Sequence, residues 1–271
     1  MENQDNLFYL IGFQRSGTTL LSHLLDKHPQ ILCIDEPEIS KRIVFKQYDL
    51  LRDITFDSIK KSLEYYNVDP ACYSELVDRF LARDIDEHSF LMNSYALFDK
   101  KNALRVGVKE VCDLTSLRHD YLRKLISFHR GRFKIILIQR DIKGVVCSFM
   151  KLGFFPPGKR KVNGFNLKRF AKQYIKALNY INKNIRGKEV YSVSFESILL
   201  EPKNELQGVC LFLGVDSSDQ VMTDLLRSRS RGTRIKYDGI RTEVRWGWKE
   251  MLRRKEIGWL NRLYDKKVQK I

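Results

Sequence analysis

The chain has 271 residues, of which 43% are hydrophobic, a size and composition that suit one α/β domain with a substantial core. No apolar run approaches the roughly 20 residues of a membrane-spanning helix, and no leader with a small-residue cleavage site precedes the first apolar run. We therefore expect a single cytoplasmic domain over residues 1–271, without a transmembrane segment.

The net charge is +16, and residues 227–271 hold 15 Lys and Arg against 5 Asp and Glu. A basic surface of this kind would attract a polyanionic substrate, an anionic lipid or nucleic acid. Peripheral membrane contact is compatible with it, and a solvated basic helix explains the charge equally well. Nucleic acid is not expected, because no nucleic-acid-binding motif accompanies the charge.

The cysteines are widely spaced, odd in number and free of C-x-x-C pairs, so they predict neither a disulfide framework nor a zinc site. We expect them to be reduced and to lie in or near the core. They are Cys33, Cys72, Cys112, Cys147 and Cys210. No cluster of carboxylates or of His and Cys suggests another metal, so no metal is expected.

The first predicted element is a strand in the apolar run Leu7–Ile11, which Gly12 bounds. A turn follows, and then a segment whose apolar residues, from Leu20 to Leu25, fall on one face at helical spacing. Amides at the start of a helix lack intrahelical partners and carry partial positive charge. A strand, a glycine turn and a helix therefore predict a site for a phosphate-like anion.

The turn lacks one residue of the P-loop that binds nucleoside triphosphates. Gly12 and Gly17 have the required spacing, but Thr18 stands where that motif has its lysine. A nucleotide kinase is therefore disfavoured, although an ordinary α/β turn remains an alternative. A compact phosphate or phosphosulfate would instead meet one guanidinium and several hydroxyls, those of Arg15, Ser16, Thr18 and Thr19.

Further strands are predicted at 31–34, 105–109, 133–139 and 190–194, with a helix at about 167–186. The run at 133–139 is nearly continuous in apolar residues, as in a central parallel strand. It leads into Arg140, and Ser148 follows eight residues later. A guanidinium and a hydroxyl supply directed donors to a phosphate. Residues 39–100 suggest helices and give no substrate code.

The segment Arg15-Ser-Gly-Thr-Thr-Leu-Leu, with His28-Pro29 after it, resembles the 5′-phosphosulfate-binding loop of sulfotransferases that use 3′-phosphoadenosine 5′-phosphosulfate (PAPS). It is most similar to the branch of the family that contains the tyrosylprotein sulfotransferases and many bacterial and Golgi enzymes. The later Arg140 and Ser148 resemble the family's 3′-phosphate site. The resemblance implies a three-layer α/β fold with a mainly parallel sheet, a P-loop-like phosphosulfate loop, and sulfuryl transfer from PAPS to a hydroxyl.

The same resemblance implies a role for several residues. Arg15, Ser16, Gly17, Thr18 and Thr19 would bind the phosphosulfate, and Arg140 and Ser148 the 3′-phosphate. Glu36 would be the catalytic base, with Asp35 and Glu38 as alternative acids, and Lys109 would stabilise charge on the sulfuryl group. Phe195 stands where many members have tyrosine, so only packing is expected of it.

Two further segments suggest contacts near the nucleotide. The loop 153–161 is interpreted as a flap or a plain surface loop, and Arg231 and Trp248 would contact phosphate or adenine, or else pack. The expected acceptor is a carbohydrate or glycolipid, and peptide tyrosine is second. A non-catalytic nucleotide- or polyanion-binding protein remains an alternative. A cytosolic small-molecule sulfotransferase is disfavoured, because no histidine lies in a Thr-His-x-Pro motif.

Overall fold

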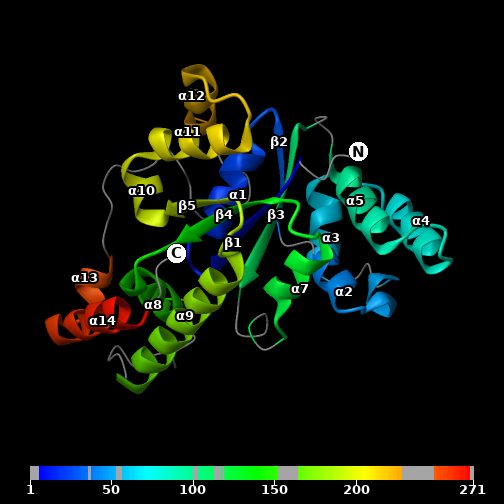
Figure 1. The fold of residues 1–271 in the computed structure, drawn as a ribbon. Helices are drawn as coiled ribbons and strands as arrows, with labels where there is room; N and C mark the ends of the chain where they lie inside the picture. Colours follow the sequence, from blue (N-terminus) through cyan, green and yellow to red (C-terminus); the bar gives the residue numbers. More distant parts are fainter. Residues whose placement is uncertain are drawn as a thin grey trace.

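The computed structural model describes residues 6–35, 38–52, 57–99, 103–112, 117, 119–151, 164–227 and 247–268. A sheet of five parallel strands lies at the centre with helices around it (Figure 1). The strands are β1 (Leu7–Phe13), β2 (Ile31–Asp35), β3 (Arg105–Cys112), β4 (Lys134–Gln139) and β5 (Val190–Ser194). Their order across the sheet is β2-β3-β1-β4-β5. The predicted α/β class and parallel sheet are confirmed, and the three-layer arrangement stays a prediction.

The burial of the central strand β1 explains why the strand sequences are so apolar. All seven of its residues are buried, because both faces of a parallel sheet are covered. Successive side chains alternate between the faces. Leu7, Tyr9 and Ile11 belong to one hydrophobic cluster, and Phe8 and Leu10 belong to another.

The helices fall into three groups according to the hydrophobic cluster that each one joins. The cluster of Phe8 and Leu10 is shared by α1 (Thr18–Asp26), α10 (Phe195–Leu200), α11 (Pro202–Leu213) and α12 (Asp219–Arg227). The cluster of Tyr9 is shared by α2 (Ile39–Val44), the 3-10 helix η2 (Tyr48–Arg52), α3 (Asp57–Tyr65), α4 (Pro70–Leu81), α5 (Glu87–Phe98) and α7 (Tyr121–Phe128). A third cluster joins α8 (Ile142–Lys151), α9 (Gly164–Ile185), α13 (Gly247–Met251) and α14 (Arg254–Lys267). The end of α9 also joins the cluster of Tyr9 through Ile181 and Ile185.

The parallel strands bring residues that are distant in the sequence to one edge of the sheet. The β1–α1 turn lies at this edge, as do Asp35 at the end of β2 and Ser194 at the end of β5. Arg140 follows β4 directly. In open α/β sheets, ligands bind beyond the carboxyl ends of the strands. The edge of the sheet at the carboxyl ends of its strands therefore carries the residues that the sequence singled out.

One sequence-based expectation about the core is wrong. Cys72 lies on α4 and is exposed, whereas the other four cysteines are buried as expected. The first turn of α4 lies at the surface, so a cysteine is tolerated there without packing against the sheet. Among the described helices, none combines the length and hydropathy needed to cross a bilayer.

The close approach of β1 and β3 predicts a strong effect for a single methyl group. Gly107 faces Phe8 across the sheet, and a Cβ at this position would come within 2.1 Å of the Phe8 ring. We expect Gly107→Ala to lower the free energy of unfolding by about 1–3 kcal/mol in urea denaturation, because the buried ring cannot move without strain.

Gly258→Ala is the matched control. Gly258 lies in α14, where the nearest atom to an added Cβ is 3.6 Å away. Alanine favours a helix over glycine by about 1 kcal/mol, so this variant should be at least as stable as the wild type. Equal destabilisation by both substitutions would contradict the packing argument.

Candidate active site

The turn between β1 and α1 requires glycine at position 17. Gly17 has a φ of 98° and Arg15 a φ of 68°, both in the left-handed region. The Ser16 amide donates to the Phe13 carbonyl at 3.1 Å. A methyl group at position 17 would come within 2.2 Å of the Phe195 ring. The backbone angle and the neighbouring ring therefore both require glycine at position 17.

Two hydroxyl side chains of this turn point inward at the start of α1. Ser16 is fully buried and Thr18 is 4% exposed. The Ser16 Oγ has no hydrogen-bond partner among the described residues, and no side chain caps the first amides of α1. Buried polar atoms in proteins normally have partners. An anion at the helix start would supply one.

Lys109 joins the start of α1 to the edge strand β2. The lysine is 3% exposed, and its Nζ donates to the Thr19 Oγ1 at 2.9 Å. It also forms an ion pair with Asp35, its register partner on β2. The Asp35 carboxylate lies 3.7 Å from the His23 Nε2.

The charge state of Asp35 follows from these neighbours. Burial raises the pKa of the Asp35 carboxyl, but the hydrogen bonds and positive charges of His23 and Lys109 outweigh burial. The pKa therefore lies below its ordinary value. At neutral pH, Asp35 is an anion that holds the Lys109 ammonium group against Thr19.

Arg140 and Ser148 lie directly beside the β1–α1 turn. The Arg140 Nη1 donates to the Arg15 carbonyl at 3.0 Å, and the Arg15 Nε donates to the Ser148 Oγ at 3.0 Å. The Arg140 guanidinium lies over the Phe195 ring, 4.1 Å from its centroid, as a cation–π pair. Residues separated by more than 120 positions in the chain thus form one cluster.

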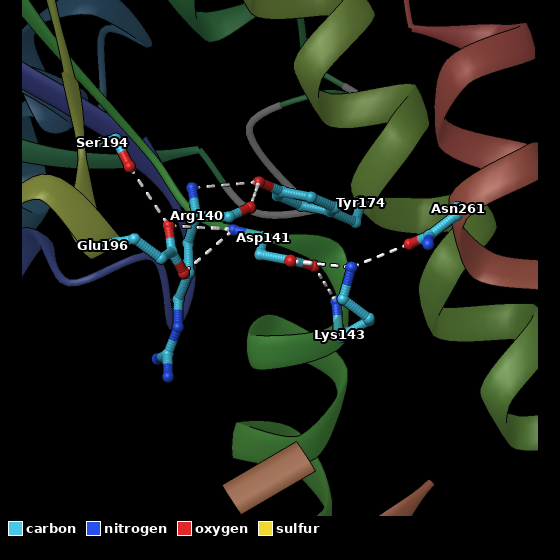
Figure 2. Close-up of polar contacts among 7 residues, drawn as sticks. All are labelled: Arg140, Asp141, Lys143, Tyr174, Ser194, Glu196 and Asn261. Atoms are coloured by element: carbon cyan, nitrogen blue, oxygen red, sulfur yellow. Dashed lines mark hydrogen bonds and ion pairs between the residues drawn. The ribbon is translucent and has the colours of Figure 1, made fainter. Parts of the chain in front are cut away.

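The backbone after β4 is fixed by two other elements (Figure 2). The Glu196 carboxylate of α10 accepts from the Asp141 amide and from the Ser194 hydroxyl, each at 3.2 Å. The Tyr174 hydroxyl of α9 donates to the Arg140 carbonyl and accepts from the Arg140 amide at 3.3 Å. Glu196 and Tyr174 therefore fix the position of Arg140 together.

Lys143 connects the same segment to the C-terminal helices. Its Nζ donates to the Asn261 Oδ1 at 2.7 Å and pairs with the Asp141 carboxylate at 2.8 Å (Figure 2). The amine also lies 5.0 Å from the centre of the Trp248 ring. Lys143, Asp141 and Asn261 border a cavity of about 400 Å³ that reaches Glu196 and Tyr264. Trp248 thus packs against Lys143.

Some residues singled out in the sequence lie outside the described part of the chain. They are Glu36, the loop 153–161 and Arg231. The turn residues, Lys109, Arg140 and Ser148 are all described, and the contacts above bring them together. Among the described residues, no group of three or more His, Cys, Asp or Glu side chains is placed to hold a metal ion.

The strand that carries Lys109 is longer than the sequence suggested. It does not end at the lysine but continues to Cys112. Because side chains alternate along a strand, Glu110 points away from Lys109. Its buried carboxylate accepts from the Tyr121 hydroxyl at 2.8 Å and from Ser40. Glu110 therefore stabilises the opposite face of the sheet.

Sequence reasoning missed the residues that support the others. The sequence suggests Asp35 only as an alternative base, and it predicts neither the pairing of Asp35 with Lys109 nor the support from Tyr174. The pairing of Asp35 with Lys109 follows from the register of β2 on β3. That register could have been suspected once both segments were interpreted as neighbouring parallel strands.

Comparison with known proteins finds similarity to one enzyme family along most of the chain. A family model described as "Sulfotransferase family" matches residues 8–219. A Caenorhabditis briggsae protein named "Putative protein-tyrosine sulfotransferase" is 23% identical over 227 residues, which span 82% of this chain and 70% of that protein.

Solved structures show the same fold at low sequence identity. The sulfotransferase domain of the Synechococcus PCC 7002 olefin synthase matches with a TM-score of 0.67 and 16% identity, covering 98% of this chain and 96% of that one. Mouse sulfotransferase SULT7A1, complexed with PAP, matches with a TM-score of 0.56 and 15% identity, covering 97% of this chain and 84% of that one. The arrangement around the sheet is thus that of sulfotransferases.

The contacts of Glu196 predict a measurable contribution to stability. Glu196→Ala would leave the Asp141 amide and the Ser194 hydroxyl without their shared acceptor. We expect the free energy of unfolding in urea to fall by about 1–3 kcal/mol. Glu75→Ala, an exposed position on α4, should change it by less than about 0.5 kcal/mol. If the two variants lose equal stability, Glu196 does not support this segment.

Proposed function

The chain belongs to the sulfotransferase family, and from this premise we propose that it moves a sulfuryl group from PAPS to an acceptor hydroxyl. The products would be a sulfate ester and 3′-phosphoadenosine 5′-phosphate (PAP). One observation carries this function: Arg15, Arg140 and Ser148 meet beside the glycine turn at the start of α1.

The described residues suit both anionic ends of PAPS. The turn offers the unpartnered Ser16 hydroxyl and the uncapped amides of α1 to the 5′-phosphosulfate. Arg140 and Ser148 would hold the 3′-phosphate through a guanidinium and a hydroxyl. The mouse enzyme of similar fold is complexed with PAP, which supports the same nucleotide here.

The proposed reaction is an in-line transfer. The acceptor oxygen forms a bond to sulfur while the bond from sulfur to the bridging oxygen of the phosphosulfate breaks. Glu36 would take the acceptor proton as general base. Arg15 and Lys109 would offset the negative charge that develops on the bridging and sulfuryl oxygens. Asp35 would position Lys109 for this task through their ion pair.

A carbohydrate or glycolipid is the proposed acceptor, and a basic surface supports it. Over residues 167–185 of α9, the exposed side chains are all basic: Lys168, Arg169, Lys172, Lys176 and Lys183. The Asn179 side chain donates to the Lys267 carbonyl at 2.8 Å, so the basic end of α14 lies beside this stripe. A surface of this charge would attract an acceptor carried on an anionic polysaccharide or lipid.

Peptide tyrosine is the second candidate acceptor. It is favoured by the name of the Caenorhabditis briggsae relative and by the likeness of the Glu36 segment to tyrosylprotein enzymes. At 23% identity, the relative supports this acceptor less strongly than it supports the family.

The nucleotide assignment is tested by calorimetry. We expect the wild type to bind PAP far more tightly than 5′-AMP, which lacks the 3′-phosphate. Arg140→Ala should weaken PAP binding about 10- to 100-fold and leave 5′-AMP binding unchanged, because charge-assisted hydrogen bonds are lost. Arg79→Ala, an exposed position on α4, serves as the control. Equal weak binding of both nucleotides would refute a 3′-phosphate site.

The base is tested by turnover. Glu36→Gln keeps the shape of the side chain and removes its proton acceptor, so kcat should fall about 10²- to 10⁴-fold while PAP affinity stays the same. Transfer of radiolabelled sulfur from PAPS to methyl hexopyranosides and to tyrosine peptides provides the measurement. Glu38→Gln is the matched control, and a loss confined to that variant would move the role to Glu38.

A further inference from the structure

A second cavity, of about 290 Å³, opens at the edge of the sheet close to Lys109. Its walls come from α1, from the edge strand β2 and from the end of α3. The residues that define it include His23, Asp35, Lys61, Ser62, Tyr65 and Tyr66. None of the functions assigned above uses this cavity.

The cavity adjoins the proposed reaction centre through α1 and Asp35. Thr19 and His23 are four residues apart, so they share one face of the helix, about 6 Å apart along its axis. Thr19 binds Lys109, and His23 faces the cavity. Asp35 contacts both Lys109 and His23. A molecule in the cavity would therefore lie one helical turn from the site of transfer.

The walls combine an exposed aromatic ring with hydrogen-bonding groups. Tyr65 is 57% exposed, and the His23 ring lies nearly parallel to it, at 12° and 6.5 Å between centroids. The buried His23 Nδ1 has no hydrogen-bond partner among the described residues. The Tyr66 hydroxyl is held by the Cys33 carbonyl at 3.0 Å, which fixes the inner wall.

We propose that this cavity binds the acceptor and takes a neutral sugar ring. The Tyr65 ring would lie against the C–H face of the sugar, and Asp35 and His23 would hold its hydroxyls. The inference rests on the proposed sulfuryl transfer, because Lys109, assigned to the reaction centre, pairs with Asp35 in the wall of this cavity.

The polar character of the walls favours a sugar over a tyrosine side chain. A sugar ring carries several hydroxyls that both donate and accept, and the cavity offers carboxylates as acceptors and the Lys61 ammonium as a donor. A phenol has one hydroxyl and would contact fewer of these groups than a sugar ring does.

Saturation-transfer NMR on the full chain with PAP bound tests this site. The probes are the methyl glycosides of glucose, galactose and mannose, with N-acetyltyrosinamide as the phenol probe. We expect at least one hexopyranoside to receive saturation. Tyr65→Ala should weaken that binding about 3- to 10-fold, because the aromatic contact is lost. Tyr65→Phe, which keeps the ring, should retain most of it.

Leu200→Ala is the matched control, since Leu200 is 58% exposed and lies outside the cavity. Neither it nor Tyr65→Ala should change PAP affinity. If PAP binds as expected but no hexopyranoside signal depends on Tyr65, the inference is wrong while the proposed function stands. A Tyr65-dependent signal from N-acetyltyrosinamide alone would also overturn it. Failure to bind PAP at all would instead remove the proposed function, and with it the acceptor role.

Discussion

The aromatic ring of Phe195 is the contact on which both halves of the candidate site depend. It fills the space beside Gly17, and the Arg140 guanidinium lies over the same ring at 4.1 Å. Because the ring sits at the start of α10, the glycine turn and the segment after β4 are held at a fixed separation. One apolar side chain thus sets the spacing between the groups assigned to the two ends of the nucleotide.

Because side chains alternate along β3, two neighbouring charged residues point to opposite faces of the sheet. Lys109 points toward α1 and Asp35, whereas Glu110, the next residue, is buried with Tyr121 on the opposite face. A slip of one residue in the register of this strand would exchange the two. The pairing of Gly107 with Phe8 opposes such a slip, since only glycine fits under that ring.

The sequence was sufficient for the strands and for the turn. Their signals are local: a continuous apolar run, two spaced glycines, and an arginine directly after a strand. It was insufficient for contacts that depend on how distant segments meet. The Glu196 carboxylate reaches the Asp141 amide across 55 positions, and Tyr174 holds Arg140 from α9. Phe195 was expected only to pack, and packing proves to be how it joins Gly17 to Arg140.

Charge is distributed differently over the surface and within the acceptor cavity. The exposed side chains over residues 167–185 of α9 are all basic, so their field extends into solvent and would attract an anionic carrier at long range. In the cavity, Asp26 and Asp35 lie beside Lys61, and Asp35 is paired with Lys109, so opposite charges nearly balance. Long-range charge changes the rate at which two molecules meet more than it changes the affinity of the complex. A carrier could thus be attracted by its anionic groups, while the unit entering the cavity is selected by its hydroxyls.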